Sequence, residues 1–168
     1  MSRIRSLFLG AALAVSSAAA PVPAEASARY FGTVEGTWKG GGSIVAGKYK
    51  GTRFNCRLKS RLVGRAAMSI DGTCRIGLFT QRITAKVSQH GQSYRGTFLD
   101  GAEGKGMDIT SGRMGANKLT VAINSKGLTG AIVANLVRRD HMRVSISVRV
   151  SSGRYVPVVG IDLQKSRG

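Results

Sequence analysis

Residues 52–63, TRFNCRLKSRLV, decide the fold, because apolar and polar side chains alternate along them. The apolar side chains share one face of an extended chain: Phe54, Cys56, Leu58, Leu62. The opposite face is polar and mostly cationic: Arg53, Asn55, Arg57, Lys59, Arg61. A period of two is that of a β-strand with one face on a core and the other in water. The stretch therefore predicts a half-buried strand.

The same alternation recurs along the chain, separated by glycine-containing turn signals. It predicts about ten short strands, at 33–44, 52–63, 67–76, 81–88, 94–99, 107–114, 118–124, 128–137, 142–150 and 156–163. The expected turns are Asp71–Gly72, His90–Gly91, Asp100–Gly101, Lys126–Gly127 and Ser152–Gly153. Residues 127–139 are the best helical candidate, but Gly130 and the β-branched residues favour a strand there.

Short connections make neighbouring strands antiparallel, and closure of the sheet removes its exposed edges. We therefore expect an all-β protein, an antiparallel up-and-down β-barrel of about 8–10 strands with one disulfide. A barrel of this size is filled by side chains or holds one small ligand.

Residues 1–28 have the pattern of a secretory signal peptide. Arg3 and Arg5 precede an apolar run at 7–15, and A-x-A sites end at Ala26 and Ala28. An A-x-A at 18–20 is less suitable, because Pro21 would follow the cut. We expect a signal peptide at 1–28, a single barrel domain at 29–168, and a periplasmic or secreted protein. No membrane span is expected after cleavage.

The two cysteines, Cys56 and Cys74, are an even number in an exported chain, so a disulfide is expected. A hairpin that turns near Gly64–Arg65 would place them opposite each other. Asp71–Gly72 is the competing turn, and the disulfide would then join two nearby strands in another way. No metal site is expected, because CxxC is absent and His90 and His141 are isolated.

The chain is strongly basic, with a formal net charge of +18. Eight Lys or Arg and no acid stand between Glu35 and Asp71. Four of these cations form a stripe of about 26 Å on the outward face of one strand, here called the basic stripe: Arg53, Arg57, Lys59, Arg61. A solvated, solubilising surface would also be basic, but self-repulsion at this charge favours an anionic partner.

For an exported protein that partner is an anionic envelope polymer or lipid head groups. Nucleic acid is not expected, because no surface aromatic cluster is available to stack bases. No enzyme motif and no cofactor motif is present, and the seven acidic residues after position 28 are scattered. We therefore expect no catalytic residues and no cofactor.

Glu35–Trp38 followed by Gly40–Gly42 resembles the G-x-W first strand of lipocalin and avidin-like barrels. That resemblance implies that Trp38 packs across one end of the barrel, although no partner Arg on a final strand can be assigned.

The order GTWKGGG, F-x-C-R, a second Cys, G-T-F and a terminal I-x-L-x-K is similar to a group of small exported β-barrel proteins of rhizobia and related alphaproteobacteria. Members usually have Trp where Phe98 stands. The resemblance supports the barrel and the disulfide and implies no activity.

Taken together, these features predict an exported, basic, non-enzymatic binding or envelope-associated protein. One alternative is a lipocalin-like or avidin-like carrier, which needs a cavity at one barrel mouth lined by Trp38 and apolar neighbours. The other is a periplasmic protease inhibitor.

Overall fold

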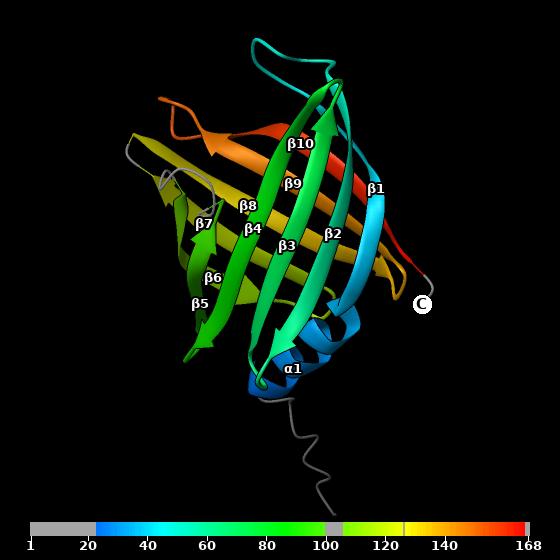
Figure 1. Cartoon of the computed structure of the whole chain (residues 1–168). Coiled ribbons are helices and arrows are strands. Elements are labelled where there is room, and N and C mark those ends of the chain that lie inside the picture. The colour runs from blue at the N-terminus through cyan, green and yellow to red at the C-terminus, as the bar shows by residue number, and fades with distance from the viewer. Residues whose placement is uncertain (1–22, 100–105, 126, 167–168) are drawn as a thin grey trace, which may run out of the picture.

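The computed structural model describes residues 23–99, 106–125 and 127–166, which form one helix and ten strands (Figure 1). The elements are α1 (Pro23–Val34), β1 (Gly36–Ile44), β2 (Arg53–Val63), β3 (Ala67–Ile76), β4 (Phe79–His90), β5 (Ser93–Phe98), β6 (Met107–Met114), β7 (Lys118–Ser125), β8 (Leu128–Arg138), β9 (His141–Arg149) and β10 (Tyr155–Lys165).

The ten strands form a closed antiparallel barrel in which each strand pairs with the next and β10 pairs with β1. The closing register sets Trp38 opposite Lys165 and Gly40 opposite Leu163. The predicted fold class is confirmed, and 128–138 is a strand as expected.

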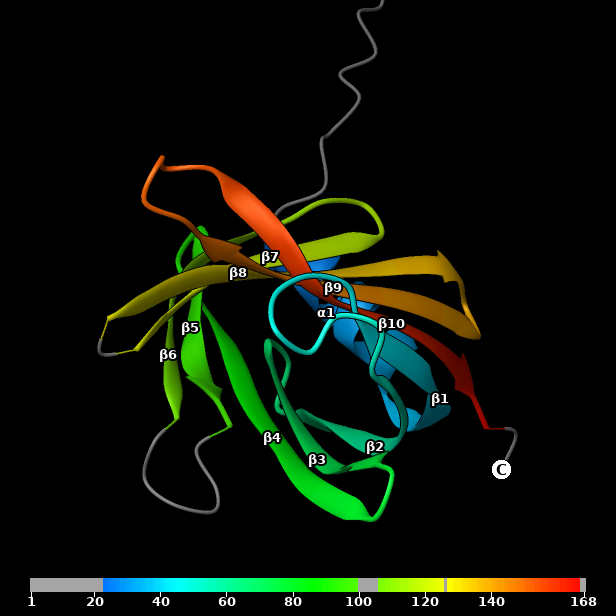
Figure 2. The same cartoon turned by 90° about the horizontal axis from the view of Figure 1, so that it is seen from above.

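The two ends of the barrel differ. Helix α1 lies across the end at which β1 begins and β10 ends, which we call the closed end (Figure 1). The opposite end, which we call the open end, is where β1, β3, β5, β7 and β9 end (Figure 2). The termini of the described chain both lie at the closed end, as an even number of up-and-down strands requires.

Helix α1 was not expected from the sequence. Pro23 suits the first helical position, and Glu25 in the first turn is favourable to the helix dipole. Four side chains at helical spacing face the barrel interior and are buried: Ser27, Tyr30, Phe31, Val34. Helix α1 therefore spans both expected cleavage sites, which follow Ala26 and Ala28.

The Asp71–Gly72 turn prediction is wrong, because both residues lie inside β3. The β2–β3 hairpin turns at 64–66, where Gly64 has φ 64°. Gly72 is needed for close packing instead: a Cβ there would lie 2.1 Å from the Arg57 carbonyl oxygen on β2. The turns at His90–Gly91 and Ser152–Gly153 are confirmed, whereas Asp100–Gly101 and Lys126 lie outside the described residues.

Candidate functional site: a barrel cavity

The barrel encloses a cavity of about 440 Å³ that runs from α1 towards the open end. All ten strands and α1 contribute to its wall, and almost every contributing side chain is aliphatic, aromatic or sulfur-containing. Ligand sites in proteins have volumes of about 300–1,000 Å³ and predominantly apolar walls. The cavity therefore has the size and lining of a small-molecule site.

Helix α1 forms the floor of this cavity through Tyr30 and Val34. The Tyr30 hydroxyl donates a hydrogen bond to the Ala134 carbonyl oxygen at 2.8 Å. Burial raises the pKa of the Tyr30 phenol well above its usual range. A second hydroxyl pair joins Ser27 to Tyr94, so the polar groups of the buried helix face have partners in the barrel wall.

The last turn of α1 is attached to the barrel through its carbonyl groups, which have no partner within the helix. Trp38 Nε1 donates to the Val34 oxygen at 2.7 Å, and Ser60 Oγ donates to the same oxygen. Lys165 Nζ donates to the Thr33 oxygen at 2.9 Å and lies 5.7 Å from the centre of the Trp38 ring. The closed end is thus fixed by side chains from β1, β2 and β10.

The structure places Trp38 at this closed end, 1% exposed, outside the set of residues that line the cavity. The expected carrier site lined by Trp38 therefore has a different composition. Phe54 and the aliphatic side chains of the strands line the cavity instead. Gly42 makes room for Phe54, because a Cβ at position 42 would lie 2.6 Å from the Phe54 ring.

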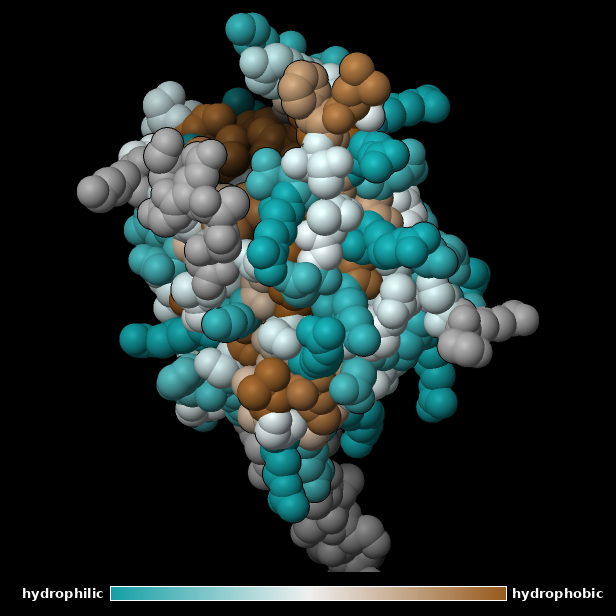
Figure 3. Space-filling view, in the orientation of Figure 1, coloured by the Kyte–Doolittle hydropathy of each residue, from teal (hydrophilic) through white to brown (hydrophobic). Residues whose placement is uncertain are grey.

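At the open end the cavity reaches the surface, where the exposed residues Leu128 and Gln81 belong to its lining. Figure 3 shows a recessed hydrophobic area at the end opposite α1. The described residues thus leave the cavity in contact with the surface at this end, whereas α1 closes the other.

Cys56 and Cys74 are directly opposite each other on β2 and β3 and form the disulfide, with a Cα–Cα distance of 4.0 Å. Both residues are buried on the inner side of the wall, and Cys74 lines the cavity. The hairpin centred at 64–66 is what brings them together.

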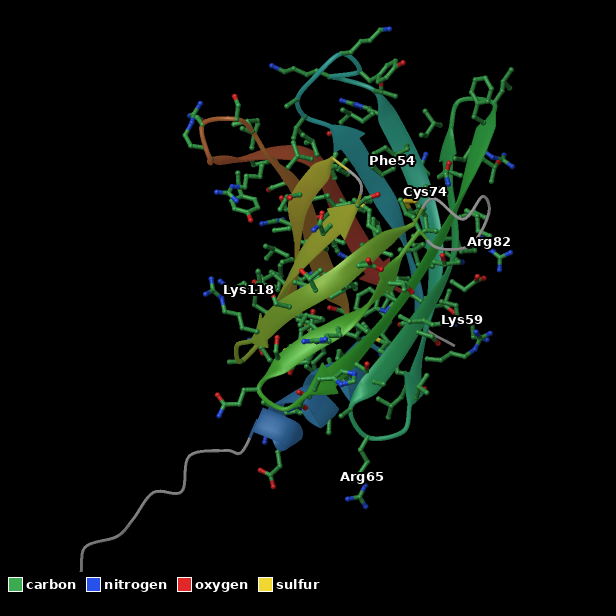
Figure 4. The ribbon with its side chains drawn as sticks, turned by 90° about the vertical axis from the view of Figure 1, so that its left-hand side faces the viewer. Phe54, Lys59, Arg65, Cys74, Arg82 and Lys118 are labelled. Atoms are coloured by element: carbon green, nitrogen blue, oxygen red, sulfur yellow. A yellow bond between two sulfur atoms is a disulfide. The ribbon has the colours of Figure 1, made fainter. Side chains whose placement is uncertain are left out.

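The basic stripe points outward from β2, as its alternation with buried residues requires. Figure 4 shows Lys59 and, on β4, Arg82 extending away from the barrel. Further cations on the outer face of neighbouring strands flank the stripe: Lys39, Arg75, Arg82, Lys86. Asp71 faces the same side, and its bond to Arg82 at 2.8 Å raises the pKa of that guanidinium. The stripe itself makes no ion pair within the described residues.

The two histidines lie on different strands and have different partners. His141 Nε2 lies 2.6 Å from Asp162 Oδ1 on the neighbouring strand, and Asp162 also pairs with Arg143 at 3.6 Å. His90 lies at the end of β4, where it contacts Ser88 Oγ at 3.1 Å. Within the described ranges no three His, Cys, Asp or Glu side chains gather as a metal site would require. In the same ranges no helix is long and apolar enough to cross a membrane.

Several solved structures are similar to this chain. Rv2717c from M. tuberculosis superposes with a TM-score of 0.57 at 9% sequence identity, over 84% of this chain and 98% of that chain. A protein of unknown function of the DUF3598 family from Nostoc punctiforme PCC 73102 gives a TM-score of 0.53 at 12% identity, over 80% of this chain and 48% of that one. The redesigned β-barrel b11L5F_LGL covers 83% of this chain and 96% of its own, with a TM-score of 0.47 at 11% identity.

Sequence identities this low show likeness of fold and nothing further. No protein-family model and no curated protein matches the chain. The class that fold and site define is a closed ten-stranded up-and-down β-barrel with an apolar interior cavity.

Sequence reasoning missed two parts of the site. The first is α1, which supplies the cavity floor. The second is Lys165, which lies over the Trp38 ring. It occupies the position of the partner Arg that could not be assigned on the final strand. The terminal I-x-L-x-K pattern was the available signal, because it sets Lys165 on the last strand of a barrel that closes against Trp38.

Proposed function

We propose that this protein is an exported, non-enzymatic carrier of an apolar or amphiphilic small molecule, which it binds inside the barrel. The observation that carries the proposal is the apolar cavity of about 440 Å³, closed by α1 and reaching the surface at the other end. An apolar cavity stays dry when empty and gains free energy when an apolar ligand fills it.

The chemistry of the wall defines the part of the ligand that enters. The deep wall offers aliphatic and aromatic surface, and the Tyr30 hydroxyl on the floor already donates to the Ala134 oxygen. A polar ligand group placed there would lose its water without gaining a partner, which is unfavourable. The inserted part is therefore hydrocarbon-like, and any polar head group lies at the open end near Gln81.

The experiment is titration of the leader-free protein with N-phenyl-1-naphthylamine, a neutral dye whose fluorescence rises in apolar sites. Ala85 is buried and lines the cavity, so Ala85→Trp fills the space and should weaken dye binding at least about tenfold. Lys86→Trp places the same side chain outside the barrel on the same strand and is the matched control. Equal affinity of both variants and the parent, or no dye binding by any of them, would refute the carrier proposal.

Export remains part of the proposal. It is supported by the leader-like pattern of residues 1–28 and, weakly, by the disulfide, which is typical of oxidising compartments. Membership in the rhizobial group of small exported barrels likewise rests on the motifs quoted above.

A second candidate function is binding of an anionic envelope polymer along the basic stripe. The observation that favours it is the excess of cations on the outward face of β1–β4. Among the described residues of this face Asp71 is the acidic one, and it already pairs with Arg82. Salt should weaken such binding steeply, because the Debye length is about 8 Å at physiological ionic strength.

The test compares Arg57→Glu/Arg61→Glu with Arg143→Glu/Arg149→Glu in binding to purified lipopolysaccharide or acidic polysaccharide. The first pair lies in the stripe and should lose more affinity, whereas Arg143 already has Asp162 as a partner. Equal losses would mean diffuse charge, and unchanged binding would remove the stripe from the function.

A further inference from the structure

We propose that the open end of the barrel docks on the surface of an anionic phospholipid membrane, from which the cavity takes up its ligand. The docking surface consists of the connections after β1, β3 and β9 and the described strand residues beside the open end. This inference rests on the proposed carrier function, and its test is designed so that the two can fail separately.

Exposed apolar side chains concentrate at this end. Eight large hydrophobic residues are exposed in the described part of the chain, and six of them lie at the open end: Val45, Tyr49, Leu78, Phe79, Leu128, Tyr155. Leu78 and Phe79, at the β3–β4 turn, are 99% and 79% exposed. Side chains this exposed make no contribution to the core, whereas they would gain free energy at a lipid interface.

Cations surround these apolar tips. The open end carries six exposed Lys or Arg in the described residues: Lys48, Lys50, Arg53, Arg75, Arg149, Arg154. None of these six forms an ion pair with an acidic side chain of the described ranges. The acidic residue that the structure describes at this end is Asp108. Hydrophobic side chains protrude beside hydrophilic ones there in Figure 3. Apolar and aromatic tips among cations have the composition that binds anionic lipid head groups.

The docking surface is continuous with the cavity. Leu128 belongs to both, because it is exposed at the open end and also lines the cavity. An apolar molecule could therefore pass from the membrane into the barrel without crossing bulk water. The orientation also leaves α1, which blocks the other end, facing away from the membrane.

Charge decides between a membrane and a second copy of this chain as the occupant. Two open ends brought face to face would place twelve cations together, in a protein whose net charge is already +18. Like charges at an interface are strongly unfavourable, whereas an anionic bilayer neutralises them. An anionic membrane is therefore the partner that the surface fits.

The experiment measures co-sedimentation of the leader-free protein with vesicles of phosphatidylcholine alone or of phosphatidylcholine and phosphatidylglycerol in equal parts. The protein should bind the anionic vesicles and not the neutral ones. Leu78→Ser/Phe79→Ser should weaken that binding at least about fivefold. The matched control is Val63→Ser/Val137→Ser, which removes two exposed apolar side chains from the closed end and should leave binding unchanged.

Charge reversal supplies the second comparison. Lys48→Glu/Lys50→Glu should weaken vesicle binding by a similar factor, whereas Arg65→Glu/Arg139→Glu at the closed end changes net charge equally and should have a smaller effect. A larger loss with Arg57→Glu/Arg61→Glu than with Lys48→Glu/Lys50→Glu would indicate docking through the basic stripe and overturn the proposal.

Three further results would also overturn the docking proposal. They are unchanged vesicle binding by Leu78→Ser/Phe79→Ser, equal binding of the parent to neutral and anionic vesicles, and a dimer of the parent in solution that Leu78→Ser/Phe79→Ser abolishes. Dye binding measured on the same variants separates the two proposals, because Leu78 and Phe79 lie outside the cavity lining. If a variant loses vesicle binding but still binds the dye, its defect is in docking. Absence of dye binding by the parent refutes the carrier function, whatever the vesicles show.

Discussion

Gly72 lies inside β3 at a point where the backbone of β2 comes too close for any larger residue. Gly72→Ala should therefore lower the free energy of unfolding by about 1–3 kcal/mol, because the two strands must separate to admit the methyl group. Urea unfolding measures the loss. Gly115→Ala is the control, since a Cβ there meets the Lys118 oxygen at an ordinary 3.6 Å. Equal stability of the two variants would show that the strands separate at no cost.

The disulfide gives a second prediction for single residues. Replacing both Cys56 and Cys74 by Ser should lower the free energy of unfolding by about 2–4 kcal/mol, chiefly because the unfolded chain gains freedom. Reduced wild-type protein should show a loss of similar size in the same urea titration. The prediction fails if reductant leaves stability unchanged, or if protein purified without reductant carries two free thiols.

For single residues, the sequence predicted well which side chains face outward or inward, and predicted poorly which residues pack against each other. Alternation alone set Arg57 outward and Cys56 inward, because a period of two leaves no other choice once the strand forms. It could not show that Gly72 serves close strand packing, since Asp-Gly is also a turn signal. Nor could it show that Lys165 lies over Trp38, which depends on the register of the closing pair.

Among the elements, α1 is held on the barrel by its buried face. Tyr30 on that face makes the free energy of unfolding depend on pH. The folded protein holds the Tyr30 phenol protonated, because burial raises its pKa above the unfolded value of 10.0. Above pH 10 the unfolded chain loses this proton and the folded chain keeps it, so stability falls by up to about 1.4 kcal/mol per pH unit. Below pH 10 the contribution is fully present.

Tyr30→Phe tests this linkage. The variant should be less stable by about 1 kcal/mol at neutral pH, because the hydrogen bond to the Ala134 oxygen is lost. The deficit should shrink and then reverse as the pH rises above 10, since phenylalanine has no proton to lose. Urea unfolding of both proteins across this range measures it, and a constant difference would contradict the linkage.

The position of α1 also bears on processing. Cleavage after Ala26 keeps Ser27 and its bond to Tyr94, whereas cleavage after Ala28 removes both. For the proposed export we therefore predict that the processed chain begins at Ser27. Intact mass of protein from the exported fraction checks this, and a chain that begins at Arg29 or retains Met1 would contradict it.

The strands were predictable because each is short and bordered by polar or glycine turns, which leaves the period-two pattern clear. Helix α1 was not predictable, because its small residues, Ala24 and Ala26 to Ala28, also suit the end of a signal peptide. Composition alone cannot separate those two readings. The buried Tyr30 and Phe31 of the same segment become meaningful only against a barrel end that they can cover.

For the molecule as a whole, the net charge of +18 should oppose folding through self-repulsion. Raising the ionic strength from about 0.01 M to about 0.15 M shortens the Debye length from about 30 Å to about 8 Å. The free energy of unfolding should therefore rise with sodium chloride over this range. Salt should raise the free energy of unfolding less in Arg57→Glu/Arg61→Glu than in the parent, because the variant has less charge repulsion to screen. A free energy of unfolding that does not change with salt in either protein would contradict self-repulsion as a destabilising effect.

The barrel was predictable at this scale, and its cavity was not. Closure follows from apolar strands with short connections, which leave no other cover for their edges. Whether the interior is filled depends on the diameter that ten strands impose and on how far residues such as Phe54 and Ile132 reach inward. Neither quantity can be read from the alternation of polar and apolar residues.

The closing pair has a consequence for how the chain folds as it emerges from the ribosome, amino terminus first. β1 cannot complete its pairing until β10 has emerged, because the register joins Trp38 to Lys165. Nascent intermediates therefore expose an unpaired β1 edge and an uncovered barrel interior for most of synthesis. Contacts this distant in sequence form slowly, whereas Cys56 and Cys74, 18 residues apart, can join early. The cations on the outer face of β2 would then hold neighbouring unfinished chains apart during that delay.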